Sequence, residues 1–348
     1  MENNTQQNSS LVHALATTVN EEDGRYLNEH LGHVLSLRLT PALPQDMPAS
    51  ELSEVEILIP FVNTRIGREE IDAMPRLQLI ATRSTGYDHI DTGYAAERGI
   101  AVANVPGYGE TAVAEYTFAL LLALSRKLRR ILTRQNGTSI EELRGFDLHG
   151  KTLGVVGTGA IGLNVIRIAN GFGMQVLAYD VRKKHFMAEL LNFRYLPLPE
   201  LLTDSDIITL HVPSLASTYH LLNRQNLPSL KPGALLINTA RGTLVETEAL
   251  VEALDNGILS GAGLDTLEGE EFLQAGDISA PDLQTDEQRK LLELYHSLQQ
   301  RENVIITPHI AFASKEALKR ILDTTIENVL AFLEGRSSNL VTPKAMVH

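Results

Sequence analysis

Three side chains with catalytic chemistry, Arg241, Glu270 and His309, each come after a short apolar run that predicts a buried strand. These runs cover residues 234–238, 261–264 and 304–306. Ligands of open parallel sheets bind outside the carboxyl ends of the strands, so we expect the three side chains to meet there. An arginine can hold a carboxylate with two hydrogen bonds, a histidine can carry a proton, and an acid can tune that histidine. Taken singly, they could equally be a surface cation, a solvated acid and a core or loop histidine.

A glycine-rich turn at residues 157–162 adds a dinucleotide signal. Its sequence Gly157-Thr158-Gly159-Ala160-Ile161-Gly162 has the spacing G-x-G-x-x-G, follows the apolar run 153–156 and opens a helical stretch. Such glycines let the backbone approach a pyrophosphate, which the helix N-terminus also attracts. Asp180 ends the next strand candidate, where a carboxylate binds the ribose 2′-OH and repels a 2′-phosphate. We therefore predict NAD (NADH) as the cofactor, although the basic residues 182–184 could weaken the preference for NAD over NADP.

Further cofactor contacts are expected at later strand ends, because those ends line the crevice of a dinucleotide fold. Val212 and Pro213 end one strand candidate and are expected to flank the adenine; the alternative is that Pro213 only terminates the strand. The full set of cofactor-binding candidates is Gly157, Gly159, Ala160, Ile161, Gly162, Asp180, Val212, Pro213, Thr218, Thr239, Ala240, Arg241 and Asp265. We expect no metal site.

The elements that must position these residues form two series of alternating strands and helices. Short apolar runs alternate with helix-like pieces over the first hundred residues, and a more regular series of six strand candidates begins at residue 151. Such alternation predicts βαβ units and parallel sheets. We therefore predict an α/β fold with two doubly wound parallel-sheet domains. A Rossmann NAD-binding domain at 106–312 is expected to be inserted into a discontinuous, flavodoxin-like substrate domain formed by 1–105 and 313–348.

The strongest helix signal runs from residue 112 to residue 128 and is apolar nearly all round its middle. A helix of this kind is buried on most sides, which fits either an ordinary core helix or an interface. We expect a homodimer. A polar segment at 271–301 lies between two strand candidates as an insertion.

Composition narrows the class of protein. Of the 348 residues, 30 are Lys or Arg and 43 are Asp or Glu, which gives a net charge of −13 at pH 7. This charge argues against a nucleic-acid or anionic-membrane partner. The absence of Cys excludes disulfides, thiolate catalysis and Cys-ligated zinc. No apolar run reaches the ~20 residues of a membrane span, and the polar residues 1–10 predict a disordered leader rather than a signal peptide. We expect a cytoplasmic protein.

Several segments together resemble the D-isomer-specific 2-hydroxyacid dehydrogenases, over about residues 55–335. They are residues 84–91, residues 104–109, the glycine-rich turn, residues 239–242 and residues 307–309. The segment His309-Ile310-Ala311-Phe312 is more similar to the D-lactate dehydrogenase branch than to the phosphoglycerate or glyoxylate branches, which usually have two glycines after His-Ile. The resemblance implies an NAD-dependent enzyme that interconverts a small 2-keto acid, such as pyruvate, and its D-2-hydroxy acid.

The resemblance also implies catalytic roles. Arg241 would bind the substrate carboxylate and polarise the keto oxygen, while His309 would be the general acid in reduction and the general base in oxidation. Glu270 would hydrogen-bond the imidazole and favour its protonated form. Many members have Pro after this Glu, whereas Glu271 follows here, so Glu268 and Glu271 are rivals. We choose Glu270 because it lies five residues after Asp265, and this spacing matches the family.

The remaining implied contacts concern the substrate and the nicotinamide. The backbone N–H groups of Thr85 and Gly86 would receive the substrate carboxylate, with Tyr108 beside it. Asp265 would face the nicotinamide side of the cofactor. Phe312, close to the catalytic histidine, predicts either a small apolar pocket wall or simple core packing.

Two other classes of function stay open at this point. NAD-linked folds of similar shape oxidise formate or phosphite, or handle adenosylhomocysteine, although the adenosine-site signals of the last are not found. A non-enzymatic alternative is an NAD-sensing, corepressor-like binding module, which can retain Arg241, Glu270 and His309. Turnover of NADH with 2-keto acids separates these alternatives. The sequence leaves open which 2-hydroxy acid is used and in which direction.

Overall fold

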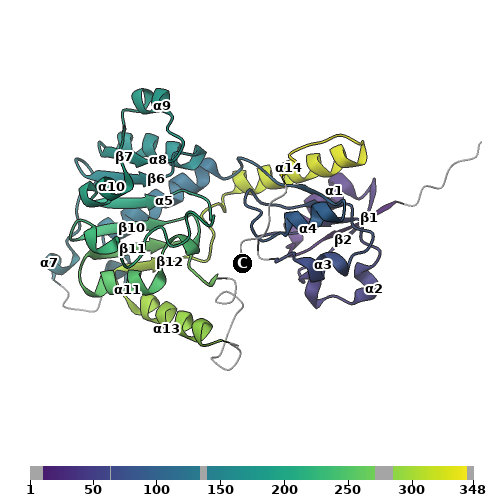
Figure 1. Ribbon diagram of the computed structural model, residues 1–348, viewed down its shortest axis with the longest axis horizontal. Coiled ribbons are helices and arrows are strands. Elements are labelled where there is room, and N and C mark those ends of the chain that lie inside the picture. Colours follow the sequence, from purple (N-terminus) through teal and green to yellow (C-terminus); the bar gives the residue numbers. More distant parts are fainter. Residues whose placement is uncertain (1–10, 63, 134–138, 271–284, 343–348) are drawn as a thin grey trace, which may run out of the picture. The chain divides into compact units, whose positions relative to one another are not determined.

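The computed structural model describes residues 11–62, 64–133, 139–270 and 285–342. The chain forms two compact units, one made of Met1–Tyr108 and Lys315–His348 and the other of Gly109–Ser314 (Figure 1). The expected boundaries, after residues 105 and 312, differ from these by three and two residues. The predicted leader and the first part of the 271–301 insertion lie outside the described residues.

The first unit, which we call the five-stranded unit, contains one parallel sheet. Its strands are β1 (Val12–Ala16), β2 (Leu35–Leu39), β3 (Ile57–Ile59), β4 (Leu79–Ala81) and β5 (Ala101–Ala103). Their order is β2-β1-β3-β4-β5, which is the flavodoxin-like order. Its helices are α1 (Glu21–Leu31), η1 (Pro44–Asp46), α2 (Ala49–Leu52), α3 (Arg68–Asp72), α4 (Thr92–Glu97) and α14 (Lys315–Leu333).

Helix α14 packs in the five-stranded unit although it follows the last strand of the other unit in sequence. Its buried Ile326 and Val329 share a core with Leu27 and Leu31 of α1 and with alternate side chains of the sheet. The opposite face of the sheet is covered by side chains from α2, α3 and α4, among them the fully buried Ile71. Helices on both faces leave the carboxyl ends of the strands as the open edge, where ligands of such sheets bind.

The second unit, which we call the seven-stranded unit, also contains one parallel sheet. Its strands are β6 (Thr152–Val156), β7 (Gln175–Tyr179), β8 (Arg194–Tyr195), β9 (Ile207–Leu210), β10 (Ala234–Asn238), β11 (Leu259–Leu264) and β12 (Val304–Ile306). Their order, β12-β11-β10-β9-β6-β7-β8, is that of a dinucleotide-binding sheet with one further strand. Its helices are α5 (Glu110–Ser125), α6 (Leu128–Thr133), α7 (Ile140–Leu143), α8 (Ala160–Gly171), α9 (His185–Leu190), α10 (Leu198–Asp204), η2 (Leu227–Ser229), η3 (Gly242–Leu244), α11 (Thr247–Asp255) and α13 (Asp286–Gln300).

The predicted fold class is therefore confirmed, with two corrections of detail. The sequence predicts six strands in the second series, and the structure adds β8, whose two residues are too short a run to give a periodic signal. The apolar helix ends at Ser125 instead of residue 128, because Lys127 adopts a left-handed backbone with φ 51° and a separate helix, α6, follows.

Helix α5 is apolar on most sides, and the structure encloses it on several of them. It packs against α8 and against β10 and β11. Gly263 of β11 lets it approach closely, since a Cβ there would lie 3.1 Å from the Cβ of Leu120. Its outer edge, at Glu115 and Ala119, is exposed.

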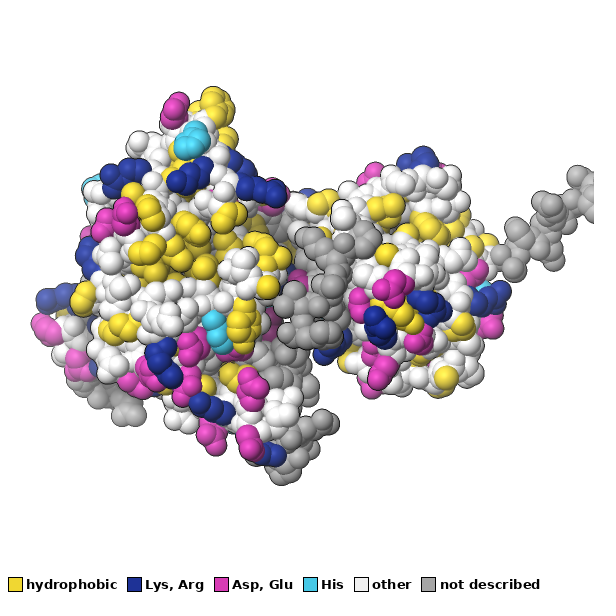
Figure 2. Space-filling model, viewed as in Figure 1, with side chains coloured by type: hydrophobic (Ala, Val, Ile, Leu, Met, Phe, Trp, Pro, Cys, Tyr) yellow, Lys and Arg dark blue, Asp and Glu magenta, His cyan; other side chains and the backbone are white. Residues whose placement is uncertain are grey.

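Acidic and basic side chains are interspersed on the visible face of each unit (Figure 2). Within the described ranges, no helix is both long and apolar enough to cross a membrane.

Candidate active site

The turn between β6 and α8 has the geometry that a dinucleotide requires. Gly157 has φ 102°, and a Cβ there would lie 2.6 Å from the carbonyl oxygen of His211, so only glycine fits. A Cβ on Gly162 would lie only 2.0 Å from the carbonyl oxygen of Gly157. Because glycine has no Cβ, the helix can pack tightly on the turn. Gly159 caps α8, and a Cβ on it would meet no atom within 4 Å. The space above Gly159 and the helix N-terminus therefore fits a pyrophosphate.

Asp180, at the end of β7, lies directly beside this turn. Its Oδ2 accepts hydrogen bonds from Thr158 N at 2.7 Å and from Thr158 Oγ1 at 3.0 Å, and its Oδ1 accepts one from Arg182 N at 2.8 Å. Burial alone would raise the pKa of Asp180, but these hydrogen bonds and the charge of Lys184 together lower it. Asp180 is therefore an ionised acceptor next to the turn, as binding of a ribose diol requires.

Five further cofactor candidates lie in the loops after β9 and β10, namely Val212, Pro213, Thr218, Thr239 and Ala240. Val212 is close to the turn, since a Cβ on Gly157 would lie 2.9 Å from its Cγ1. Thr218 Oγ1 donates to Pro213 O at 2.7 Å and accepts from Leu215 N at 2.8 Å, so its hydroxyl shapes this loop. Thr239 is buried, and its hydroxyl contacts that of Thr117 at 3.0 Å. Direct contact of these side chains with NAD remains a prediction.

His309 and Glu270 form a hydrogen-bonded pair. His309 Nδ1 lies 2.9 Å from Glu270 Oε1, and the two side chains are 24% and 22% exposed. His309 follows β12 and has φ 53°, a left-handed conformation that directs its side chain out of the strand path. Glu270 comes from the loop after the neighbouring strand β11. The pair is thus accessible to a small ligand while its geometry is fixed.

The buried carboxylate of Asp265 holds the loop that carries His309. Asp265 is 1% exposed and accepts hydrogen bonds from Thr307 Oγ1 at 2.6 Å, Ile310 N at 3.0 Å and Ala311 N at 2.8 Å. Its own carbonyl oxygen accepts from His309 N at 2.9 Å. Asp265 therefore bends the chain around the histidine, and its expected position near the nicotinamide remains a prediction.

The structure separates Glu270 from its rival Glu268. Glu268 Oε1 lies 2.6 Å from His220 Nε2, and its Oε2 accepts from Thr247 Oγ1 at 3.0 Å, so Glu268 faces the start of α11. The turn between the two acids contains Gly269 with φ 76°. This turn packs against Gly242, where a Cβ would lie 2.0 Å from the carbonyl carbon of Leu267. Glu271, the other rival, lies outside the described residues.

Arg241 stands after β10, the strand next to β11. Asn238 shapes its loop, because Nδ2 donates to Arg241 O at 2.8 Å and Oδ1 accepts from Ala240 N at 3.1 Å. The guanidinium is partly buried, and its Nη1 donates to Ala240 O at 2.8 Å. Arg241, Glu270 and His309 thus stand at the carboxyl ends of three consecutive strands of one sheet.

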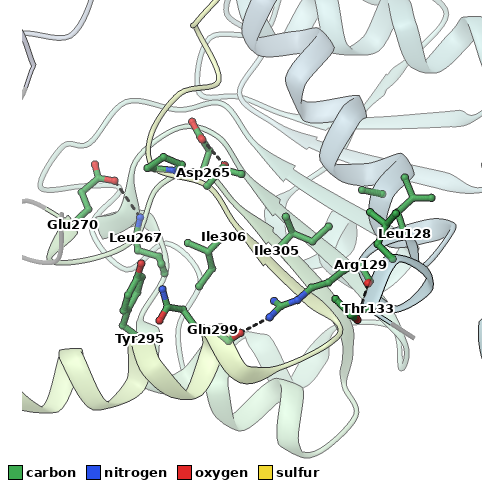
Figure 3. A pocket seen from close by; sticks show the side chains of 14 residues that line it. Leu128, Arg129, Thr133, Asp265, Leu267, Glu270, Tyr295, Gln299, Ile305 and Ile306 are labelled. Carbon is green, nitrogen blue, oxygen red and sulfur yellow. Dashed lines mark hydrogen bonds between the residues drawn. The ribbon is translucent and has the colours of Figure 1, made fainter. Parts of the chain in front are cut away.

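A cavity of about 910 Å³ borders the acids of this site (Figure 3). Asp265 and Glu270 line one side of it, and Figure 3 shows Leu128, Arg129 and Tyr295 among the other lining side chains. These come from α6 and α13. Glu270 therefore has open space on one flank, while Glu270 Oε2 accepts a weak hydrogen bond from Leu267 N at 3.4 Å.

Two backbone N–H groups in the five-stranded unit, those of Thr85 and Gly86, are oriented by their neighbours. Val105 N donates to Ser84 O at 2.9 Å, and Asn104 Nδ2 donates to Thr85 O at 2.8 Å. In a trans peptide the C=O and the following N–H point in opposite directions. Both N–H groups therefore face away from the loop after β5, and neither has an acceptor among the described residues. Successive N–H groups arranged in this way bind anions.

Tyr108 and Phe312 lie at the ends of the two units. The carbonyl oxygen of Tyr108 accepts hydrogen bonds from Arg320 Nε at 2.9 Å and Nη2 at 2.8 Å, which fixes its backbone on α14. Phe312 is half-buried in the seven-stranded unit and lies beside Gly109, because a Cβ on Gly109 would be 3.6 Å from the Cβ of Phe312. Their predicted contacts with substrate remain predictions.

Two residues that the sequence patterns do not single out, His211 and Arg83, also lie at the carboxyl ends of these strands. His211, directly before Val212, is partly buried, and its buried Nδ1 has no hydrogen-bond partner among the described residues. Burial lowers the pKa of His211 to about 3, so the ring is neutral. Arg83, directly before Ser84, is buried at the edge of the other sheet. The only sequence feature that could have indicated His211 and Arg83 is that each stands next to a segment with predicted site residues. In the part of the chain that the structure describes, no cluster of His, Asp and Glu could hold a metal ion.

The fold and this arrangement define the class of NAD-dependent dehydrogenases, and comparison with known proteins agrees. Residues 118–311 match the family described as D-isomer specific 2-hydroxyacid dehydrogenase, NAD binding domain. The chain is 35% identical over 322 residues to D-lactate dehydrogenase of Escherichia coli, covering 90% of this chain and 95% of that one. It is 37% identical over 303 residues to glyoxylate reductase of Korarchaeum cryptofilum, covering 85% of each.

A solved structure gives the same result. D-lactate dehydrogenase from Aquifex aeolicus, complexed with NAD and lactic acid, superimposes with a TM-score of 0.84 at 41% identity, covering 92% of this chain and 96% of that one. The chain belongs to the D-isomer-specific 2-hydroxyacid dehydrogenase family, in its D-lactate dehydrogenase-like branch. The predicted cofactor, NAD, and the predicted enzyme class are thereby confirmed.

The glycine turn yields a test that separates cofactor binding from folding. In Gly159→Ala the added methyl meets no protein atom, so stability should fall by no more than about 1 kcal/mol, the usual cost of alanine at a helix N-cap. The same methyl would occupy the space above the helix N-terminus, so the Kd for NADH should rise by roughly ten-fold or more, about 1.4 kcal/mol. Fluorescence titration with NADH and thermal unfolding measure the two effects.

Gly171→Ala is the matched control. Gly171 ends the same helix, and a Cβ there also meets no atom within 4 Å. This variant should bind NADH as the unmutated protein does. Unchanged NADH affinity in Gly159→Ala would show that the pyrophosphate does not lie over the turn.

Proposed function

We propose that this dehydrogenase reduces a small 2-keto acid of the pyruvate type to its D-2-hydroxy acid, and catalyses the reverse oxidation, with His309 as general acid and base. The observation that carries the proposal is the 2.9 Å pair between His309 Nδ1 and Glu270 Oε1 on strand ends next to that of Arg241. This edge of the sheet carries a histidine that can transfer a proton, an acid paired with it, and an arginine that can bind a carboxylate. These groups suit a reaction that moves a proton and a hydride.

Residues of the seven-stranded unit would hold the cofactor. The glycine turn would bind the pyrophosphate and Asp180 the ribose hydroxyls, and its charge would exclude a 2′-phosphate. When bound, NADH supplies the hydride that reduces the keto carbon. Val212 and Pro213 would flank the adenine, with Thr218, Thr239, Ala240 and Asp265 as further contacts.

His309 would supply the proton. Because Nδ1 is held by Glu270, Nε2 is the nitrogen left to face the substrate. The imidazolium would donate from Nε2 to the oxygen that becomes the hydroxyl, and the neutral ring would accept that proton in the oxidation. The ionised carboxylate of Glu270 would stabilise the imidazolium through the Nδ1–H hydrogen bond.

Arg241 would bind the substrate carboxylate with two N–H groups and stabilise negative charge on the reacting oxygen. The N–H groups of Thr85 and Gly86, which the loop after β5 orients, would receive the same carboxylate, with Tyr108 nearby. Phe312 would give the pocket an apolar wall, which suits a small side chain such as the methyl of pyruvate.

The choice of pyruvate over glyoxylate rests on the segment after the histidine. His309-Ile310-Ala311-Phe312 resembles the D-lactate dehydrogenase branch, and the Aquifex aeolicus structure holds lactic acid. A glyoxylate reductase is also similar to this chain, so glyoxylate is the first competitor in a substrate panel.

The proposal includes a cytoplasmic homodimer that binds neither nucleic acid nor membrane. Helix α6 exposes two large apolar side chains, Leu128 at 44% and Leu132 at 83%. A second copy of the chain would cover them. Sedimentation equilibrium should give twice the mass of one chain, and a monomer at micromolar concentration would contradict this part of the proposal.

The acid–base assignment predicts a specific pH dependence. Reduction of pyruvate requires protonated His309, so the rate should fall as pH rises. Glu270→Gln removes the negative charge that favours the imidazolium, so the fall should move to lower pH. His309→Ala should lose roughly 10²–10⁴-fold in kcat, as for loss of a general acid. Steady-state rates measured across pH test both variants.

Glu268→Gln is the matched control for the first variant. Glu268 contacts His220 and Thr247 instead of His309, so its neutral form should leave the pH profile in place. A profile that moves with Glu268→Gln and stays fixed with Glu270→Gln would overturn the assignment.

A further inference from the structure

Arg83 is a buried cation at the carboxyl edge of the five-stranded sheet. It is the second residue after β4, and its side chain is 4% exposed. Nη2 donates to Thr17 O at 2.6 Å and to Thr18 O at 3.1 Å, both just after β1. The guanidinium carbon lies 5.2 Å from the centroid of the Phe61 ring, in the segment after β3. Arg83 thus connects the ends of three strands of this sheet.

Stability alone does not account for a guanidinium at this position. Its nearest carboxylate, that of Asp23, lies 3.9 Å from Nη1, and the buried Nε has no hydrogen-bond partner among the described residues. Burial lowers the pKa of Arg83 to about 10 against the attraction of Asp23, so the group stays charged at neutral pH. An apolar side chain of similar volume would fill this space without the cost of burying a charge.

Residues 84–86, whose N–H groups would receive the substrate carboxylate, follow Arg83 directly in the chain. Arg83 N donates to Pro60 O at 2.9 Å, so main chain and side chain both hold the residue that precedes Ser84. Ser84 Oγ donates to Gly86 O at 2.7 Å, and Thr85 Oγ1 donates to Val105 O at 2.7 Å. The loop is therefore fixed by β5 on one side and by Arg83 at its start.

We propose that Arg83 is a positioning residue for the substrate carboxylate. It holds residues 84–86 so that the N–H groups of Thr85 and Gly86 stay turned toward the anion, and it keeps a positive charge at that edge of the sheet. This inference rests on the proposed function, in which these N–H groups receive the carboxylate of the 2-keto acid. Arg83 itself touches neither the substrate nor the cofactor in this role.

The role predicts a separation of kinetic constants. Loss of Arg83 weakens binding of the carboxylate in the ground state and the transition state alike, so KM changes while kcat does not. The cofactor turn belongs to the other unit, so the KM for NADH should stay constant. A general loss of folded enzyme would instead lower the apparent kcat and leave KM in place.

The experiment uses the full chain with pyruvate as substrate and oxamate as a non-reacting carboxylate probe. Arg83→Met should raise the KM for pyruvate and the inhibition constant of oxamate together by roughly ten-fold or more, with kcat within about three-fold of the unmutated enzyme. Arg83→Lys keeps the charge and one donor nitrogen, so it should give a smaller rise in both constants. NADH titration of each variant verifies that the seven-stranded unit is folded.

Arg98→Gln is the control within the same unit. Arg98 stands just before β5, at the amino edge of the sheet, and pairs with Asp72. Loss of the Arg98 charge should therefore leave the KM for pyruvate and the inhibition constant of oxamate unchanged. If Arg83→Met keeps both constants within about two-fold, or lowers kcat alone, the inference is overturned while the proposed function stands. If the unmutated enzyme neither reduces pyruvate nor binds oxamate, the proposed function fails and the inference falls with it. Should Arg83→Met not fold, Arg83→Lys against Arg98→Gln gives the same decision.

Discussion

The buried carboxylate of Asp265 is the interaction on which the active site depends. Three donors from the loop after β12 converge on its two oxygens, and this convergence bends the chain into the left-handed turn that presents His309. Asp265 also begins the loop that carries Glu270. One buried carboxylate thus fixes the loop of His309, one member of the 2.9 Å pair, and stands at the start of the loop that carries the other. A buried carboxylate without its donors would be strongly destabilising, so the loop has little freedom to adopt another path.

Parallel topology supplies the rest of the arrangement. Because β10, β11 and β12 are neighbours and run in one direction, the residues after them meet at one edge without any special contact between the strands. The same rule explains the five-stranded unit, where the ends of β1, β3 and β4 bring Thr17, Pro60 and Arg83 together. In both units a buried charged group links loops from neighbouring strands. Asp265 does so through its acceptors, and Arg83 does so through its donors.

Much of this could be predicted from the sequence because the signals are local. Apolar periodicity located the strands after which Arg241 and His309 stand, and the glycine spacing located the turn beside Asp180. The contacts that fix the site are not local. Asp265 and its donor Ala311 are 46 residues apart, and Arg83 and Thr17 are 66 residues apart, so no window of sequence contains either interaction. The pairing of Glu268 with His220 is of the same kind, so the sequence alone kept Glu268 as a rival of Glu270. Strand β8 was missed because two residues carry no period.

In the proposed reaction His309, Glu270 and Arg241 together reduce a 2-keto acid to one enantiomer of its hydroxy acid. The most direct measurement follows NADH consumption by the full-length protein with pyruvate, and resolves the lactate formed on a chiral column. We expect one lactate for each NADH oxidised, all of it the D-enantiomer. L-lactate, a racemic product, or no consumption of NADH with pyruvate, glyoxylate, hydroxypyruvate, phenylpyruvate or 2-ketoisocaproate would contradict it.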